Sequence, residues 1–298
     1  MALIMDAPGV TALRIALAAL FTTLVTVSIY WVRYRPLGFL AIVLLVGWWL
    51  RIPATNEANW APDYARVPVI ERAGQYVTIH DIRNFRYRSE EDFDASYYDA
   101  TYPLDELSSL DLVTSYWAGD NIAHVFVSFG FRDGRHLAVS IETRRRKYQT
   151  YSTVAGFFRQ YELIYVAGDE RDLMGLRTDI RRERVYLYPV RLSPENRRRF
   201  FESYLERMER LEKQPEFYNT MTNNCTTNIL ARANEVAPAI SYSWKILASG
   251  HAAEYAYDLG LLDNDVPFSV LHRRSLIRRA PAAPIDPDFS AHIRQPVL

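Results

Sequence analysis

Two apolar runs near the N-terminus constrain this chain more than any other feature. Residues 15–32 read IALAALFTTLVTVSIYWV, about eighteen residues without a charge, which is the lower limit for a helix that crosses a bilayer. Residues 37–50 form a second, shorter run, LGFLAIVLLVGWWL, whose tryptophan pair could extend it into the lipid interface. A turn with the sequence RYRP separates the two runs. We therefore expect two transmembrane helices, at about 13–33 and 37–50, joined as a hairpin that occupies residues 1–51.

The charges around the hairpin predict its orientation. Arg33 and Arg35 lie in the tight turn, and the positive-inside rule places that turn in the cytoplasm. The N-terminus and everything after Leu50 would then lie outside, although Arg14 and Arg51 at the outer ends oppose this orientation. A cleavable signal peptide is the alternative for the first run. It fits poorly, because the start of the chain lacks a basic segment and a second apolar run follows at once.

The rest of the chain divides by composition. Residues 52–65 are polar with two prolines before Asp63 and indicate a linker that leaves the membrane. Residues 66–278 contain strand patterns followed by helical patterns, so we expect one α+β domain. Residues 279–298 are rich in proline and predict a peripheral tail. Lysine plus arginine number 35 and aspartate plus glutamate also number 35, so the charge gives no reason to expect nucleic acid as a partner.

Strand and helix signals alternate within the domain. The strongest strand is 122–130, IAHVFVSFG; an Asp-Gly turn follows it, and 137–142 (LAVSIE) would return as the second strand of a hairpin. Residues 89–98 are acidic and predict a loop, whereas the aromatic spacing of 154–165 resembles a helix. The Ser-Pro pair at 193–194 opens an amphipathic helix, with serine as the N-cap and proline at the first helical position.

Cys225 is the only cysteine in the sequence. It lies in the polar segment TNNCTTN, which leads into an apolar helical pattern, and asparagine and threonine are residues that begin helices. A thiol there lies near the positive end of a helix dipole, which favours the nucleophilic thiolate. A small buried core residue is the alternative, but a core cysteine normally has apolar neighbours. We therefore expect a reactive thiol.

A thiol nucleophile needs a base, and the base needs a group that orients it. His124 is the best of the six histidines, because it lies in an apolar strand where an imidazole is costly without a partner; a satisfied core histidine is the alternative. Glu142 ends the returning strand and could orient His124, unless it is simply an exposed strand end. A shift of one residue in register would place the two on opposite faces, and the sequence leaves that register open.

A basic run, TRRRKYQTY, follows the second strand. It is either a solvated loop or a site for a lipid phosphate that is formed by Arg144, Arg145 and Arg146. Metal binding is the main rival chemistry, but the spacings typical of zinc ligands and the glycine-rich loops that bind nucleotide phosphates are missing from the sequence. We therefore expect neither a metal nor a cofactor.

The segments around these residues resemble the Lnb N-terminal periplasmic domain family, from about residue 79 to residue 234. The matching segments are HVFVSFGF from His124, SIETR from Ser140, FRQYELIYV from Phe158, DERDL from Asp169 and PEFYNTMTNNCTTN from Pro215. The resemblance implies an α+β fold of the permuted papain-like (NlpC-type) kind, an antiparallel sheet with packed helices in which the histidine strand precedes the cysteine helix. The order His124, Glu142, Cys225 agrees with that permutation.

The same resemblance implies lipoprotein N-acyltransfer by a multi-pass protein of the bacterial inner membrane, with its domain in the periplasm. Cys225 would take an acyl chain from a glycerophospholipid as a thioester, with His124 as the base and Glu142 as its orienting group. The chain would then pass to the amino group of the lipidated N-terminal cysteine of a diacylated lipoprotein.

Further residues would bind the substrate, and two other functions stay open. Backbone N–H groups at Cys225, together with Asn223 or Asn224, would stabilise the oxyanion, and Tyr218 is a candidate for binding the substrate. One alternative function is a cysteine peptidase or amidase that acts on cell-wall peptides. The other is a membrane-anchored binding protein that is not an enzyme.

Overall fold

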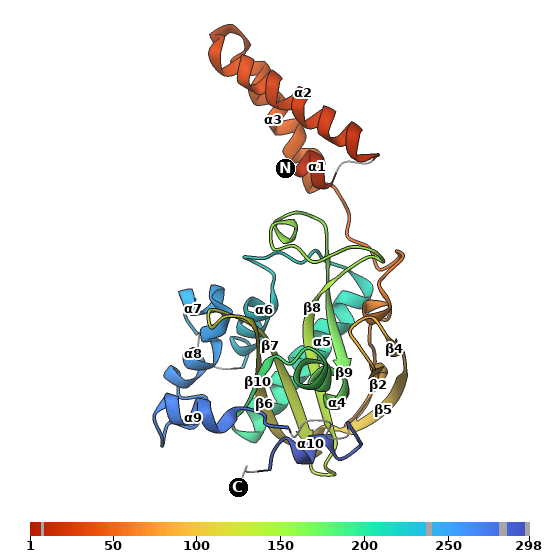
Figure 1. Cartoon of the computed structure of the whole chain (residues 1–298), viewed down its shortest axis with the longest axis vertical. Coiled ribbons are helices and arrows are strands. Elements are labelled where there is room, and N and C mark those ends of the chain that lie inside the picture. Colours follow the sequence, from red (N-terminus) through yellow and green to blue (C-terminus); the bar gives the residue numbers. More distant parts are fainter. Residues whose placement is uncertain (7–8, 237–239, 280–284, 296–298) are drawn as a thin grey trace.

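The computed structural model describes residues 1–6, 9–236, 240–279 and 285–295. After a short helix α1 (Ala2–Met5), two apolar helices, α2 (Thr11–Tyr30) and α3 (Arg35–Leu50), form a hairpin that projects from the rest of the molecule (Figure 1). The spans Thr11–Tyr30 and Val32–Leu50 are long and apolar enough to cross a membrane. Gly38 of α3 faces Ser28 of α2 so closely that a Cβ atom there would overlap the serine hydroxyl, which explains the glycine at this crossing.

An eight-stranded mixed sheet forms the centre of the domain. Its order is β1-β2-β9-β8-β7-β6-β10, β5 pairs with β2, and the neighbours are antiparallel except for β2 and β9. The strands of this sheet are β1 (Val69–Ala73), β2 (Tyr76–Arg83), β5 (Tyr97–Pro103), β6 (Leu107–Ala118), β7 (Ile122–Phe131), β8 (His136–Arg144), β9 (Glu162–Gly168) and β10 (Arg184–Pro189). A separate two-stranded sheet consists of β3 (Arg86–Tyr87) and β4 (Phe93–Asp94). The α+β class predicted from the sequence is confirmed.

Both faces of the sheet are covered, because successive residues of each strand point to opposite sides. On one face, Phe129 of β7 packs against Phe201 and Tyr204 of the long helix α5 (Pro194–Lys213). On the other face, Phe126 packs in a second core that includes Leu173 of α4 (Glu170–Leu173). The remaining helices are α6 (Cys225–Ala233), α7 (Trp244–Leu247), α8 (Ala252–Asp258), α9 (Phe268–Ser275) and α10 (Phe289–His292). Figure 1 shows α10 at the end of the domain away from the hairpin.

Two predictions of local structure are wrong. Residues 89–98, predicted as a loop, contain β4 and the start of β5, because β5 gains its hydrogen bonds from β2, a partner that the local pattern does not show. Residues 154–165, predicted as a helix, hold one 3₁₀ turn at Ala155–Phe157, and Glu162 then begins β9. All seven residues of β9 are buried, since it lies between β2 and β8, so it lacks the alternation that identifies a half-buried strand.

The two segments that border the domain pack against it. In the linker, residues 52–65, the Asn56 side chain donates to two carbonyl oxygens at the end of α5, at 3.0 and 2.7 Å. In the segment expected as a peripheral tail, residues 279–298, Phe289 is only 1% exposed and belongs to the second core. The described part of that segment is therefore not peripheral, because it supplies an aromatic side chain that the second core buries.

Candidate active site

The pairing of β7 with β8 brings His124 and Glu142 together. The register sets Val127 opposite Val139, and its continuation toward the start of β7 sets His124 opposite Glu142. His124 Nε2 lies 3.1 Å from Glu142 Oε1 and 2.6 Å from Ser140 Oγ. The Ser140 hydroxyl donates in turn to Glu142 Oε1 at 2.7 Å. The imidazole is therefore oriented by a serine and a carboxylate from the neighbouring strand.

Cys225 begins helix α6, because Asn224 caps that helix. Asn224 Oδ1 accepts a hydrogen bond from the Thr227 backbone N–H at 2.9 Å, and Thr227 Oγ1 accepts one from the Asn224 N–H at 2.8 Å. This reciprocal pair is a capping box. The thiol consequently occupies the first turn of a nine-residue helix, where the helix dipole favours a thiolate. The His124 side chain and the Val125 backbone N–H are its hydrogen-bonding neighbours.

The charges of the three side chains reinforce one another. Burial alone would raise the pKa of Cys225, but the hydrogen bond and charge of His124 outweigh it and lower that pKa. Burial alone would lower the pKa of His124, but the charge of Glu142 raises it to about 9. Burial would raise the pKa of Glu142 too, yet His124 holds it well below its usual range. The site therefore favours a thiolate beside an imidazolium near neutral pH.

Arg177 is a charged neighbour of the site that the sequence did not predict. It belongs to a short π-helix, Leu176–Ile180, and its Nη2 donates to Glu142 Oε1 at 3.0 Å. A buried carboxylate needs such a partner, because leaving it unpaired would be costly. No motif identifies Arg177. Ser140 could have been predicted from the sequence. It is a polar residue in an apolar strand, and it lies two positions before Glu142, so its side chain points to the same face of the sheet as that of Glu142.

A cleft of about 600 Å³ opens over these residues. Its lining combines aromatic, aliphatic and positively charged side chains with the three residues of the site and with two further carboxylates, Glu90 and Glu183, that pair with Arg181 and Arg177. Its lining residues include Trp117, Ile122, His124, Glu142, Arg145, Tyr151, Arg177, Arg181, Arg182, Tyr218, Cys225 and Leu247. Such a cleft suits a ligand that has both an apolar part and a polar part.

The residues predicted to bind the oxyanion or substrate fall into two groups. The amide of Asn224 donates to the Thr220 carbonyl at 2.7 Å, and the amide of Asn223 donates to the Phe217 carbonyl at 2.8 Å. Both asparagines therefore hold the loop before α6 together, and the free N–H groups in the first turn of that helix are the better oxyanion donors. Tyr218 does line the cleft, and burial raises its pKa, which keeps its hydroxyl protonated.

The structure does not bring the three predicted arginines to one site. Arg144 is 2% exposed and donates to Asn56 Oδ1 at 2.7 Å and to two linker carbonyls at 2.9 Å. Arg146 pairs with the buried carboxylate of Glu162 at 3.1 Å. Only Arg145 lines the cleft. The reason is the alternation of side chains at the end of β8, which turns neighbouring residues in opposite directions.

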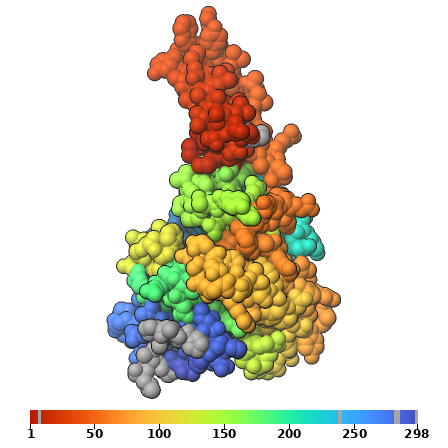
Figure 2. Space-filling model, turned by 45° about the vertical axis from the view of Figure 1, so that its right-hand side comes forward, coloured from red at the N-terminus to blue at the C-terminus, as the bar shows by residue number. Residues whose placement is uncertain are grey.

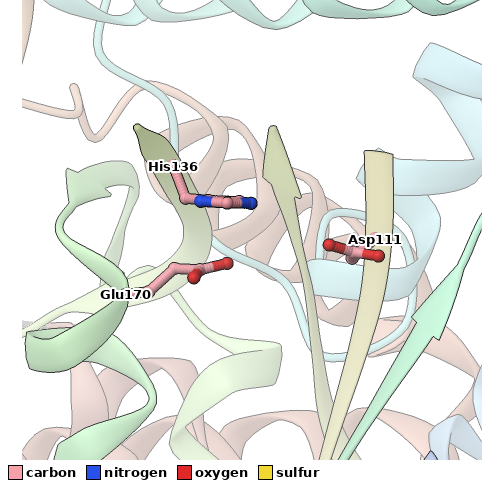
Figure 3. A group of neighbouring side chains, drawn as sticks. All are labelled: Asp111, His136 and Glu170. Carbon is pink, nitrogen blue, oxygen red and sulfur yellow. The ribbon is translucent and has the colours of Figure 1, made fainter. Parts of the chain in front are cut away.

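A second group of titratable side chains lies at the other end of the sheet. Asp111, His136 and Glu170 present atoms within 4.8 Å of one another, an arrangement that could hold a metal ion (Figure 3). The Arg294 guanidinium lies 2.6 Å from both Asp111 and Glu170, however. Because an arginine already balances these carboxylates, we interpret the group as an anchor for the C-terminal segment rather than a metal site.

The fold and the site together define a membrane-anchored α+β domain with a buried thiol, imidazole and carboxylate beneath a cleft. The family described as the Lnb N-terminal periplasmic domain matches residues 93–250, which is 158 of 298 residues, and the chain belongs to that family. His124, Glu142 and Cys225 all lie inside the matched range. Comparisons with curated proteins and with solved structures give no match. The family and the two apolar helices indicate a membrane-anchored protein with a periplasmic domain.

Proposed function

We propose that this protein is a lipoprotein N-acyltransferase, anchored in the bacterial inner membrane by both helices of its hairpin and active in the periplasm. The observation that carries the proposal is the arrangement of Cys225, His124 and Glu142 beneath the cleft in a chain of this family. A permuted papain-like relationship is part of the same proposal, because here too the histidine strand precedes the cysteine helix. The proposed partners are a glycerophospholipid, a diacylated lipoprotein and the membrane that holds both.

The first step would form a thioester. The Cys225 thiolate attacks an ester carbonyl of the phospholipid, and N–H groups in the first turn of α6 stabilise the resulting oxyanion. The His124 imidazolium then donates its proton to the departing glycerol oxygen. The C–O bond breaks, a lysophospholipid leaves, and the acyl chain stays on the sulfur. Glu142 and Ser140 keep the imidazole ring oriented during the transfer.

The second step would transfer the chain to the lipoprotein. The free amino group of the lipoprotein attacks the thioester carbonyl, and the neutral His124 removes a proton from the attacking nitrogen. The C–S bond breaks, the amide product leaves, and the thiolate and imidazolium are restored. No external oxidant or cofactor is needed to balance either step.

An apolar cavity beside the nucleophile supports a lipid substrate over a cell-wall peptide. It has a volume of about 100 Å³, lies between the sheet and α6, α7 and α8, and is lined almost entirely by aliphatic side chains. Thr226, the residue after Cys225, borders both this cavity and the cleft. Each methylene group of a chain that enters the cavity would gain about 0.8 kcal/mol by leaving water. A polar peptide gains nothing comparable there.

Complementation tests the proposal. The full-length protein should restore N-acylated lipoproteins, detected by mass spectrometry of their N-terminal peptides, in a strain that lacks its own lipoprotein N-acyltransferase. Cys225→Ala should abolish this, whereas Met221→Ala, at an exposed position four residues earlier, should not. Full complementation by Cys225→Ala would overturn the acyltransfer mechanism. Release of cell-wall fragments by the purified protein, without lipoprotein acylation, would favour an amidase instead.

A further inference from the structure

The connection from β8 to β9, residues 145–161, is tied to the outer ends of the membrane hairpin. Arg159 donates a hydrogen bond to the carbonyl of Ile52, which lies two residues after α3 ends, and its guanidinium stacks 5.0 Å from the Trp49 ring centre. Gln160 donates to the Met5 carbonyl at 2.8 Å. The contacts therefore reach both the segment that precedes α2 and the segment that follows α3.

These contacts fix the height of the connection relative to a bilayer. Two residues of extended chain span at most about 7 Å. The head-group region on each side of the hydrocarbon core is roughly 5–7 Å thick. Arg159, held at Ile52, consequently lies at the level of the lipid head groups when α3 crosses the membrane.

Exposed apolar side chains gather along this connection and on the neighbouring β6–β7 turn. We call them the collar; its members are Trp117, Ile122, Tyr148, Tyr151, Val154 and Phe157. Tyr148 is 89% exposed, and the rings of Trp117 and Tyr151 lie 6.5 Å apart, which joins the two parts of the collar. Exposed apolar groups of this kind mark an interaction surface, and tryptophan and tyrosine are the residues enriched at membrane interfaces.

The collar also borders the cleft. Trp117, Ile122 and Tyr151 line the cleft that contains Cys225. In Figure 2, the residues around 150, coloured green, lie directly beneath the N-terminal helices. The collar and the cleft therefore share a border.

We propose that the collar is a membrane-binding surface that inserts into the head-group region of the leaflet next to the domain and leads a lipid into the cleft. The surface has one occupant, a lipid bilayer, because the hairpin itself holds the connection at that height. The proposal goes beyond acyltransfer, since the collar would contact the bilayer whatever reaction Cys225 performs. Lys147, within the same connection, adds a positive charge that suits anionic head groups.

Site-directed spin labelling of the full chain tests the collar. The protein would carry Cys225→Ser and one new cysteine, Val154→Cys or Phe157→Cys, each with a nitroxide, in nanodiscs of phosphatidylethanolamine and phosphatidylglycerol. The label should collide more often with oxygen, which concentrates in lipid, than with a water-soluble nickel complex. Control labels at Tyr76→Cys and at Leu259→Cys, both exposed apolar positions away from the collar, should show the opposite order. Collar labels that behave like the controls would overturn the proposal.

A second experiment separates membrane contact from folding and from chemistry. In the protein with Cys225 intact, Val154→Asp with Phe157→Asp should slow acylation of Cys225 by bilayer phospholipid at least tenfold. The same variant should leave its reaction with water-soluble p-nitrophenyl acetate unchanged. Loss of both reactions would mean that these side chains support the fold. Loss of neither would mean that they do not contact lipid. Either result contradicts the proposal that the collar binds the membrane. If the unaltered protein reacts with the acetate but never with phospholipid, the acyltransfer proposal fails, while the spin-label result still decides the collar.

Discussion

Replacing Glu142 by glutamine should uncouple the thiol from its base. Glutamine keeps the size of the side chain and can still contact Ser140, but it removes the negative charge that raises the pKa of His124 to about 9. Without that charge, burial and the nearby Arg177 both lower this pKa and the hydrogen bond with Cys225 opposes them, so it should fall toward the ordinary value of 6.5. The change from about 9 to 6.5 corresponds to roughly 3 kcal/mol of lost stabilisation of the imidazolium.

The consequence at neutral pH follows from the two pKa values. At pH 7, a pKa of about 9 keeps roughly a hundred imidazolium rings for each neutral one, whereas a pKa of 6.5 leaves neutral rings in the majority. The thiolate then loses its positive neighbour. That loss outweighs removal of the weaker repulsion from Glu142, so the pKa of Cys225 should rise. We expect its reaction with iodoacetamide at pH 7 to slow in Glu142→Gln.

The assay is the pH dependence of alkylation, and the sequence makes it simple because Cys225 is the only cysteine. In the unaltered protein the rate should rise with a midpoint below the ordinary thiol pKa, while Glu142→Gln should shift that midpoint to higher pH. Phospholipid turnover should also fall above pH 9, as His124 loses the proton that it must donate. The pKa of His124 is raised by folding, so its contribution to stability is complete at low pH and is lost as the pH rises through about 9.

Glu90→Gln is the matched control, because Glu90 lines the same cleft and pairs with Arg181 rather than with His124. Its alkylation profile should coincide with that of the unaltered protein. If Glu142→Gln had the same midpoint as Glu90→Gln while remaining folded, Glu142 would not control the thiolate–imidazolium pair.

Three further substitutions, two of them paired with a control variant, test other parts of the structure. Arg144→Ala should lower the free energy of unfolding by about 3 kcal/mol, since it leaves the buried Tyr64 carbonyl without its donor, while Arg132→Ala should cost less than 1 kcal/mol because its ion pair with Glu106 is exposed; urea unfolding measures both, and equal losses would contradict the assigned roles. Asn224→Ala should cost about 1 kcal/mol through loss of the N-cap, and an unchanged unfolding curve would show that the capping box does not stabilise α6. Ala256→Leu should fill the apolar cavity and slow the reaction with long-chain p-nitrophenyl esters but not with the acetate. Ala100→Leu, on β5, is the control and should leave both reactions unchanged. A uniform effect on all chain lengths would show that the acyl chain does not enter the cavity.

The parts of the site that depend on residue type could be predicted from the sequence. Cys225 stands out because polar cap residues surround a lone thiol, and His124 stands out because an imidazole interrupts an apolar strand. The Asp-Gly turn predicts a β-hairpin in which Glu142 lies near the same end as His124. The two membrane helices could also be predicted from local sequence, since about eighteen uncharged residues suffice to predict a membrane span.

The parts that depend on contacts distant in sequence could not be predicted. His124 lies beside Glu142 because of the register that pairs Val127 of β7 with Val139 of β8, and Arg177 reaches Glu142 from a short π-helix 35 residues later. Because every residue of β9 is buried, the strand lacks the alternation of apolar and polar residues that identifies a strand. The aromatic spacing of residues 154–165 therefore resembled one face of a helix. Arg144 looked available for phosphate because it stands in a basic run, yet the linker supplies partners for its donors.

Direct detection of the thioester tests the central claim most simply. The full-length protein, incubated with a phospholipid of known acyl composition, would be digested and the peptide that contains Cys225 weighed by mass spectrometry. We expect an added acyl mass on Cys225 that hydroxylamine removes, that is missing from His124→Ala, and that disappears when a diacylated lipoprotein peptide is supplied. A folded, membrane-reconstituted protein that never carries an acyl group on Cys225 would contradict it.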